Sequence, residues 1–121
     1  MNKKILFVDD SESIREIVNF TLTREGYEVT LSSNGKEALN YLNGTEYNLI
    51  ITDLYMPEMN GIELIKEIRK KPEYKYTPIL FLSTESQLDK KMEAKEAGAT
   101  GWIVKPFVPA KLIEAINKVI K

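Results

Sequence analysis

Short apolar runs alternate along the chain with segments of helical spacing. Four runs are too short for helices, lack alternation and are rich in β-branched and aromatic residues, which is typical of strands buried on both faces. A fifth run, residues 27–31, alternates more clearly and predicts an edge strand. The four buried strands are predicted at residues 5–8, 49–51, 79–82 and 102–104.

Apolar residues at helical spacing fill the intervals between these runs and predict five helices. Gly26 and Gly44 close the first two helices, Pro72 follows the third and Pro109 opens the fifth. The fourth helix has so little apolar surface that we expect it to pack shallowly. The apolar positions are Ile14, Ile17, Val18 and Leu22; Ala38, Leu39 and Leu42; Leu64, Ile65 and Ile68; Leu88, Met92, Ala94 and Ala97; and Ile113, Ile116 and Ile120.

A strand followed by a helix, repeated five times, predicts an α/β fold with a doubly wound parallel sheet and helices on both faces. The 121 residues fit one hydrophobic core. We therefore expect residues 1–121 to form one domain with no output domain attached.

Composition narrows the chemistry that this domain can perform. Lys and Arg number 17 against 18 Asp and Glu, and this balance argues against a nucleic-acid or membrane-surface partner. The chain has no Cys and no His, which excludes disulfides, thiolate zinc sites and any His-based triad. Metal or nucleophile chemistry must therefore use carboxylates. No apolar run is long enough for a signal peptide or a membrane helix, so we expect a cytoplasmic protein.

Polar side chains gather at the predicted carboxyl ends of the strands. Asp9 and Asp10 follow the first strand, and Asp53 follows the third. Ser83 and Lys105 end the next two strands along the chain. Because ligands of open parallel sheets bind beyond the carboxyl ends of the strands, we expect these groups to converge.

Three carboxylates so close together repel one another unless a cation lies among them. Mg²⁺ suits a site of carboxylates, waters and phosphate oxygens. A carboxylate can also act as a nucleophile that forms an acyl phosphate. Phosphoryl transfer needs positive charge and positioning around the transferred oxygens, which Mg²⁺, Lys105 and Ser83 would supply.

Each of these residues also has a purely structural interpretation. Asp10 could cap the first helix, or residues 13–16 could form its capping box. Asp53 could be a turn residue before Pro57. Each alternative explains one residue, whereas the functional interpretation explains all of them.

Four motifs, each at the end of a strand, resemble the receiver domains of two-component response regulators. They are residues 8–10, 53–61, 82–84 and 105–107. The resemblance covers essentially the whole chain and is closest to the CheY-like, single-domain receivers of the chemotaxis type. It implies a flavodoxin-like sheet with strand order 2-1-3-4-5.

The resemblance also implies a role for each residue of the acidic site. Asp53 corresponds to the phosphoacceptor, and Lys105 corresponds to the family's invariant lysine. Asp10, Asp53 and the backbone carbonyl of Tyr55 would bind Mg²⁺ directly. Asp9 would act on the ion mainly through water.

Other positions correspond to the switch and to the lifetime of the phosphorylated form. Ser83 matches the hydroxyl that senses the phosphoryl group, and Trp102 falls where the family has its switch aromatic, usually Tyr or Phe. Without the resemblance, Trp102 could equally be a core aromatic. Tyr55, Thr84 and Glu85 stand at positions that tune the rate of dephosphorylation.

We therefore predict a phosphorylation-operated switch. The phosphodonor must be a phosphohistidine of another protein, expected to be a chemotaxis-type histidine kinase, and a phosphatase is a further expected partner. From Ser86 onward the sequence contains seven Lys and four acidic residues, and this excess of positive charge suits an acidic peptide such as that of the flagellar motor switch as the target. An ordinary solvated surface would have the same composition.

Three other functions are alternatives to this switch, and only the first of them remains open from the sequence. A phosphorelay intermediate of the sporulation type would pass the phosphoryl group to another histidine, and one sequence does not separate it from a motor-binding switch. A non-phosphorylated interaction scaffold should have lost an acid or the lysine. A flavin carrier would share the fold, but the acidic residues 9–12 would repel its phosphate.

Overall fold

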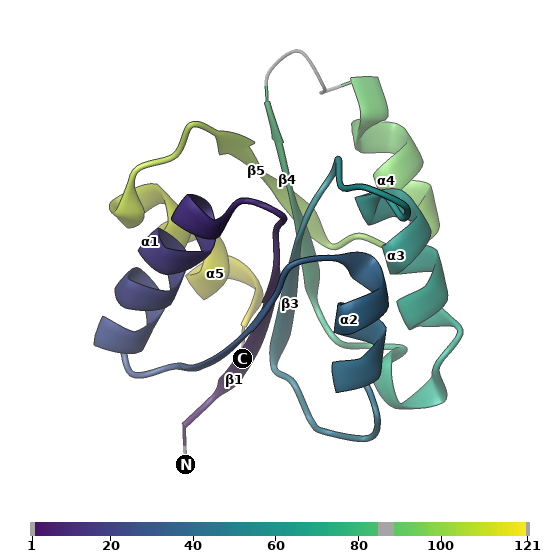
Figure 1. Cartoon of the computed structure of the whole chain (residues 1–121), viewed down its shortest axis with the longest axis horizontal. Coiled ribbons are helices and arrows are strands. Elements are labelled where there is room, and N and C mark those ends of the chain that lie inside the picture. Colours follow the sequence, from purple (N-terminus) through teal and green to yellow (C-terminus); the bar gives the residue numbers. More distant parts are fainter. Residues whose placement is uncertain (1, 85–88, 121) are drawn as a thin grey trace.

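The computed structural model describes residues 2–84 and 89–120. Five parallel strands form one sheet in the order β2-β1-β3-β4-β5, which confirms both the predicted fold and its strand order (Figure 1). β2 is an edge strand, as predicted. β5 is the other edge strand, which corrects the prediction that residues 102–104 are buried on both faces, because only Ile103 of these three residues is buried. The strands are β1 (Lys4–Val8), β2 (Glu28–Ser32), β3 (Leu49–Asp53), β4 (Ile79–Thr84) and β5 (Gly101–Lys105).

The helices cover both faces of the sheet. In Figure 1, α1 and α5 lie on one side, and α2, α3 and α4 lie on the other. A short 3₁₀ helix, η1 (Pro72–Tyr74), joins α3 to β4. The α-helices are α1 (Glu12–Arg24), α2 (Gly35–Tyr41), α3 (Gly61–Arg69), α4 (Lys91–Ala97) and α5 (Pro109–Val119).

The period of two along each strand divides the core into two layers. Ile5 and Phe7 of β1 pack under α1 and α5, whereas Leu6 and Val8 pack under α2, α3 and α4. Because both faces of β1 are covered, four consecutive apolar residues are all fully buried. The unbroken apolar runs of the sequence follow from this arrangement.

The start of α1 corrects both capping alternatives. The side chain of Ser11 caps this helix and accepts a hydrogen bond from the backbone N–H of Ile14 at 3.3 Å. Neither Asp10 nor a capping box at residues 13–16 is needed, and Asp10 keeps its carboxylate for other contacts. Gly26 follows the end of α1 with a φ of 91°, as its predicted place after the helix requires.

The helical stripes were predicted less well than the strands. Ile17 was expected in the core, but its side chain is 52% exposed. Leu112 was missed and is a fully buried residue of α5, packed with the core residues on that face of the sheet. Within α4 only Ala94 is buried, which confirms shallow packing. Leu88, the predicted first apolar residue of that helix, lies outside the described residues.

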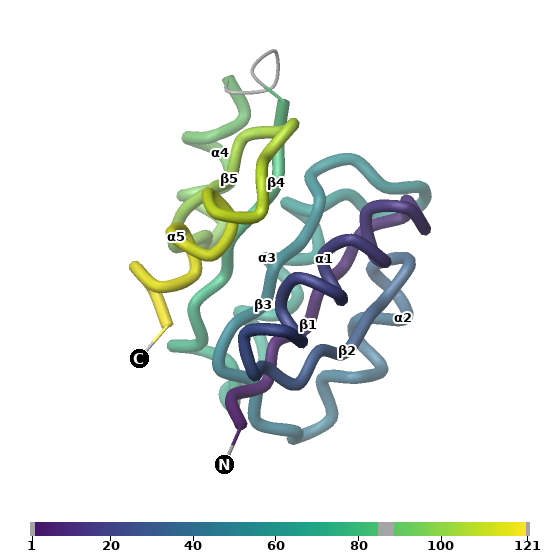
Figure 2. The backbone as a smooth tube through the Cα atoms, turned by 90° about the vertical axis from the view of Figure 1, so that its left-hand side faces the viewer, coloured from purple at the N-terminus to yellow at the C-terminus, as the bar shows by residue number. Residues whose placement is uncertain are grey.

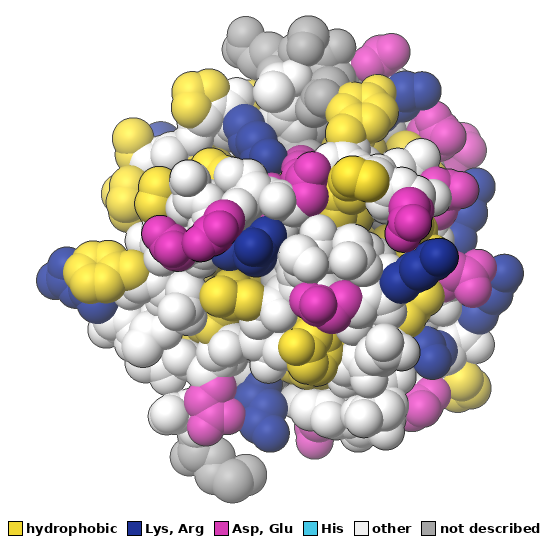
Figure 3. All heavy atoms as spheres, in the orientation of Figure 1, with side chains coloured by type: hydrophobic (Ala, Val, Ile, Leu, Met, Phe, Trp, Pro, Cys, Tyr) yellow, Lys and Arg dark blue, Asp and Glu magenta, His cyan; other side chains and the backbone are white. Residues whose placement is uncertain are grey.

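All strands run in one direction, away from the end at which β1 begins (Figure 2). Their carboxyl ends therefore share one edge of the molecule. Acidic and basic side chains are interspersed over the face seen in Figure 3, in keeping with the balanced composition. Among the described residues no helix is long and apolar enough to cross a membrane.

Candidate functional site

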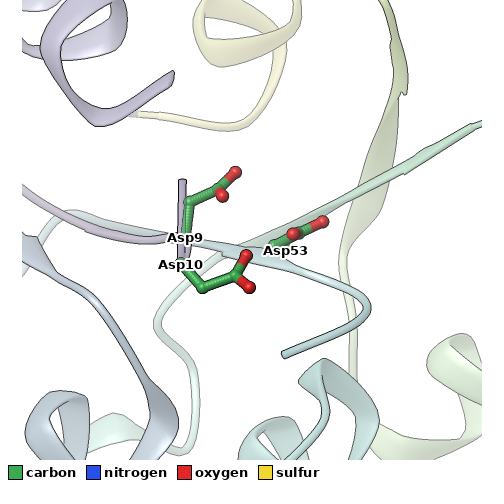
Figure 4. A group of neighbouring side chains, drawn as sticks. All are labelled: Asp9, Asp10 and Asp53. Atoms are coloured by element: carbon green, nitrogen blue, oxygen red, sulfur yellow. The ribbon is translucent and has the colours of Figure 1, made fainter. Parts of the chain in front are cut away.

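Three carboxylates meet at the carboxyl ends of β1 and β3. The two strands are neighbours, and the pairing of Val8 with Thr52 brings the residues that follow them side by side. Carboxylate oxygens of Asp9, Asp10 and Asp53 lie within 4.8 Å of one another. Figure 4 shows the three side chains projecting to the same side of the sheet edge. The convergence predicted from the sequence is therefore present.

Asp9 is fully buried and held from several directions. Its Oδ1 accepts a hydrogen bond from the backbone N–H of Ser11 at 2.9 Å, and its Oδ2 lies 3.3 Å from Lys105 Nζ. Its backbone carbonyl accepts a hydrogen bond from Arg15 Nη1 at 2.7 Å. Both carboxylate oxygens of Asp9 thus already have partners within the protein, whereas the Asp10 side chain is exposed.

Asp53 ends β3 and is only 9% exposed. Its Oδ1 accepts hydrogen bonds from the backbone N–H of Leu54 at 2.9 Å and from Lys105 Nζ at 3.0 Å. Burial raises the pKa of Asp53 above its ordinary value and the negative charge of Asp9 raises it further, while Lys105 only partly offsets both. An extra cation at this edge would therefore stabilise the ionised form of Asp53.

Lys105 ends β5 and bridges two of the carboxylates. Burial on its own would lower the pKa of this ammonium group, but Asp53 and Asp9 outweigh burial and raise it above its ordinary value. Lys105 therefore remains positively charged at neutral pH.

The turn after β3 needs a glycine at its far end. The backbone N–H of Gly61 donates to the carbonyl of Leu54 at 2.7 Å, and a side chain at Gly61 would collide with the backbone carbonyl of Asp53. Only glycine allows α3 to begin so close to the site. Tyr55 lies in the same turn, with its side chain half exposed.

The hydroxyl of Ser83 has an unusual environment. Ser83 is fully buried in β4, opposite Val104 of β5, and its Oγ has no hydrogen-bond partner among the described residues. Buried hydroxyl groups are nearly always hydrogen-bonded. A ligand oxygen at this edge could provide the missing partner.

Trp102 lies on β5 opposite Phe81 of β4, and its side chain is 39% exposed. The alternative that Trp102 is a core aromatic is therefore wrong. Lys91 of α4 places its Nζ 3.4 Å from the centre of the indole ring. A hollow of about 280 Å³ beside the ring is also lined by Lys95 and Thr100.

Of the remaining two positions predicted to tune dephosphorylation, the structure describes only Thr84. Thr84 is the last residue of β4 and is half-buried. Glu85 lies outside the described residues, so its role stays a prediction.

Sequence reasoning assigned no role to three contributors to this site, although Leu54 and Gly61 lie within the motif at residues 53–61. Arg15 holds the carbonyl of Asp9, the backbone N–H of Leu54 holds Asp53, and Gly61 makes room for the turn. Arg15 left one usable signal, because it is a basic residue in the second turn of a helix that directly follows an acidic pair. The contacts of Leu54 and Gly61 involve backbone atoms, which side-chain patterns do not reveal.

Comparison with known proteins gives consistent results. Residues 5–117 match the family described as the response regulator receiver domain. A chemotaxis protein CheY homolog of Campylobacter jejuni is 41% identical over 119 residues, covering 97% of this chain and 92% of that protein.

Solved structures show the same similarity. The chemotaxis response regulator CheY4 of Vibrio cholerae superposes with a TM-score of 0.94 at 46% identity, covering 99% of this chain and all of that one. The receiver domain of the sensor histidine kinase PA1611 of Pseudomonas aeruginosa has a TM-score of 0.89 at 25% identity, covering 98% of both chains. That structure is described with a magnesium ion coordinated in its active-site cleft.

Proposed function

This chain belongs to the family of response regulator receiver domains, and we propose that it is a cytoplasmic, phosphorylation-operated switch of a chemotaxis system with Asp53 as phosphoacceptor. One observation carries the proposal. Asp53 is a buried carboxylate at a strand end, 3.0 Å from Lys105 and grouped with two further acids. Chemotaxis is supported by the names of the similar proteins from Campylobacter jejuni and Vibrio cholerae.

The oxygen donors at this edge fit Mg²⁺. We assign Asp10, Asp53 and the backbone carbonyl of Tyr55 as direct ligands. Asp9 would act through water, because both of its carboxylate oxygens already accept hydrogen bonds or ion pairs. When bound, Mg²⁺ would relieve the repulsion among the carboxylates and neutralise negative charge on the phosphoryl oxygens. The magnesium ion described for the Pseudomonas aeruginosa receiver supports this assignment.

Asp53 is positioned to act as the nucleophile. Among the described residues its hydrogen bonds converge on Oδ1, so Oδ2 is the oxygen left to attack phosphorus. A P–O bond forms to Asp53 while the P–N bond of the donor phosphohistidine breaks, and the electron pair returns to the imidazole nitrogen. In dephosphorylation, water attacks phosphorus, the P–O bond to Asp53 breaks, and the carboxylate and inorganic phosphate are released.

Lys105 and Ser83 would stabilise the transferred group and report its presence. The Lys105 ammonium lies beside the attacking carboxylate of Asp53 and would pair with a phosphoryl oxygen. The Ser83 hydroxyl, which has no partner among the described residues, would donate a hydrogen bond to another phosphoryl oxygen. Movement of Ser83 toward the phosphoryl group would free space into which Trp102 can turn, and so couple the site to the surface. Tyr55, Thr84 and Glu85 would set how quickly water reaches phosphorus.

The partners follow from the same chemistry. The chain has no His, so the phosphodonor is a phosphohistidine of another protein, which we assign to a chemotaxis-type histidine kinase. The output surface would be that of α4, β5 and α5. Lysines outnumber acids in this part of the chain, which supports an acidic peptide of the flagellar motor switch as the target.

Intact-mass measurement after incubation with acetyl phosphate and Mg²⁺ tests this function directly. We expect wild type to gain one phosphoryl group only when Mg²⁺ is present, and Asp53→Asn to gain none. Asp89→Asn is the matched control, because it removes the same charge from an exposed residue that lies outside the site.

An acyl phosphate can hydrolyse too quickly to be trapped, so a stable beryllium fluoride adduct should be sought as well. Folded wild type that shows neither a mass gain nor this adduct would contradict the proposed phosphorylation. A mass gain in Asp53→Asn equal to that of wild type would contradict Asp53 as the acceptor.

A further inference from the structure

Among the residues that the structure describes, Asp10 is the carboxylate of the cluster with the fewest contacts to hold it. Asp9 is buried, with both carboxylate oxygens occupied, and Asp53 is held through Oδ1. The Asp10 side chain, in contrast, is exposed. Its direction is therefore set mainly by the backbone that carries it, the peptide bond joining Asp9 to Asp10.

That peptide bond is fixed by a side chain from α1. Arg15 is half-buried, and its Nη1 donates a 2.7 Å hydrogen bond to the carbonyl of Asp9, which belongs to this peptide unit. The backbone N–H of Asp9 donates to the carbonyl of Ser32 of β2 at 3.0 Å. The chain is thus held just before Asp10 from the β2 side and from the α1 side.

We propose that Arg15 is a positioning residue for the metal: its guanidinium fixes the Asp9–Asp10 peptide so that the Asp10 carboxylate faces that of Asp53. The inference deepens the proposed function, because it rests on Mg²⁺ binding at this edge. Second-shell hydrogen bonds that orient ligands commonly change metal affinity by tenfold or more.

The positive charge of Arg15 is not the main contribution. The Nη1 of Arg15 contacts a neutral backbone carbonyl. Removing the donor should therefore weaken Mg²⁺ binding through geometry, and a variant that keeps a donor should recover part of the affinity.

Titration calorimetry with Mg²⁺ on the folded protein tests this inference. Arg15→Met keeps the apolar stem but has no donor, and we expect its Mg²⁺ affinity to fall about tenfold. Arg15→Lys restores a single donor and should bind more tightly than Arg15→Met. Arg24→Met is the matched control, because it removes the same charge from the far end of α1, where Arg24 lies over the Phe20 ring, and it should bind as wild type does.

Circular dichroism at the titration temperature should show every variant folded, so that the comparison reports on the metal site alone. Arg15→Met binding as tightly as Arg24→Met would overturn the inference and leave the proposed function standing. Arg15→Lys binding as weakly as Arg15→Met would also overturn it, because the donor would then not matter. A wild type that binds no Mg²⁺ would overturn the proposed metal site itself, and this inference with it.

Discussion

The ionised carboxylate of Asp53 is buried and lies beside the negative charge of Asp9, and both effects should lower the stability of the folded protein. The pKa of Asp53 lies near the ordinary 3.8 in the unfolded chain and is raised in the folded protein. Between the two values the folded protein holds more protons, so the stability of wild type should fall as pH rises through this window. Above the window, the cost of ionising Asp53 in the fold is fully present.

Asp53→Asn should therefore be more stable than wild type at neutral pH without Mg²⁺. We expect this gain because the variant lacks a charge whose ionised form is disfavoured by burial and by Asp9. Urea unfolding at several pH values measures it, and the advantage of the variant should shrink toward zero below pH 3.8. A variant less stable than wild type at neutral pH would show that the Lys105 ion pair outweighs burial.

The Ser83 hydroxyl predicts a second conflict between stability and function. Because Oγ is buried without a partner among the described residues, Ser83→Ala should leave stability unchanged or raise it by about 1 kcal/mol. The same variant should bind beryllium fluoride more weakly, because a donor to the adduct is lost. Urea unfolding and titration of the adduct measure the two effects. Marked destabilisation by Ser83→Ala would show that the hydroxyl has a structural role.

At the scale of elements, α4 holds the one tryptophan of the chain in its outward position. A cation–π contact contributes about 1 kcal/mol, enough to shift a two-state equilibrium roughly fivefold. Lys91→Ala should therefore change the Trp102 fluorescence of the unphosphorylated protein, so that it comes part of the way toward the Trp102 fluorescence of the protein with bound beryllium fluoride. Lys95→Ala is the control, because Lys95 lines the same hollow without making the ring contact. Equal spectral changes in the two variants would contradict a specific role for Lys91.

The sequence predicted the elements well where burial is symmetric and less well where it is not. β1 is covered on both faces, so its apolar run marks the strand directly. Ile17 was placed in a core stripe but is exposed, and Leu112 was missed but is buried, because the spacing of apolar residues does not show where the buried stripe of a helix ends. α4 buries only Ala94, so periodicity carried little information about its start.

For the site, the sequence predicted which acids converge, because strand ends of a parallel sheet must share an edge. The sequence could not predict the hydrogen bonds that hold these acids in place. The hydrogen bond from Arg15 to the Asp9 carbonyl depends on the side-chain path across a helix turn. The Ser83 hydroxyl has no hydrogen-bond partner in the part of the chain that the structure describes, and only the packed structure can reveal this.

At the scale of the whole molecule, the acidic site and the stability of the fold are linked through the metal. A ligand that binds only the folded state adds stability that grows with its concentration, about 1.4 kcal/mol at tenfold excess over its dissociation constant. Added Mg²⁺ should therefore raise the unfolding free energy of wild type, as urea unfolding at increasing Mg²⁺ measures. Asp10→Asn should show little gain, and the control Asp89→Asn should show the full gain.

Asp53→Asn makes the same test sharper. Without Mg²⁺, the unfolding free energy of this variant should be higher than that of wild type, because a buried charge has been removed. It should rise little as Mg²⁺ is added, because a metal ligand has been lost. The two stabilities should therefore converge, and cross if the Mg²⁺ gain exceeds the cost of ionising Asp53. Parallel curves for the two proteins would show that Asp53 does not bind the ion. Convergence would show that bound Mg²⁺ offsets the repulsion among the three carboxylates at the carboxyl ends of β1 and β3.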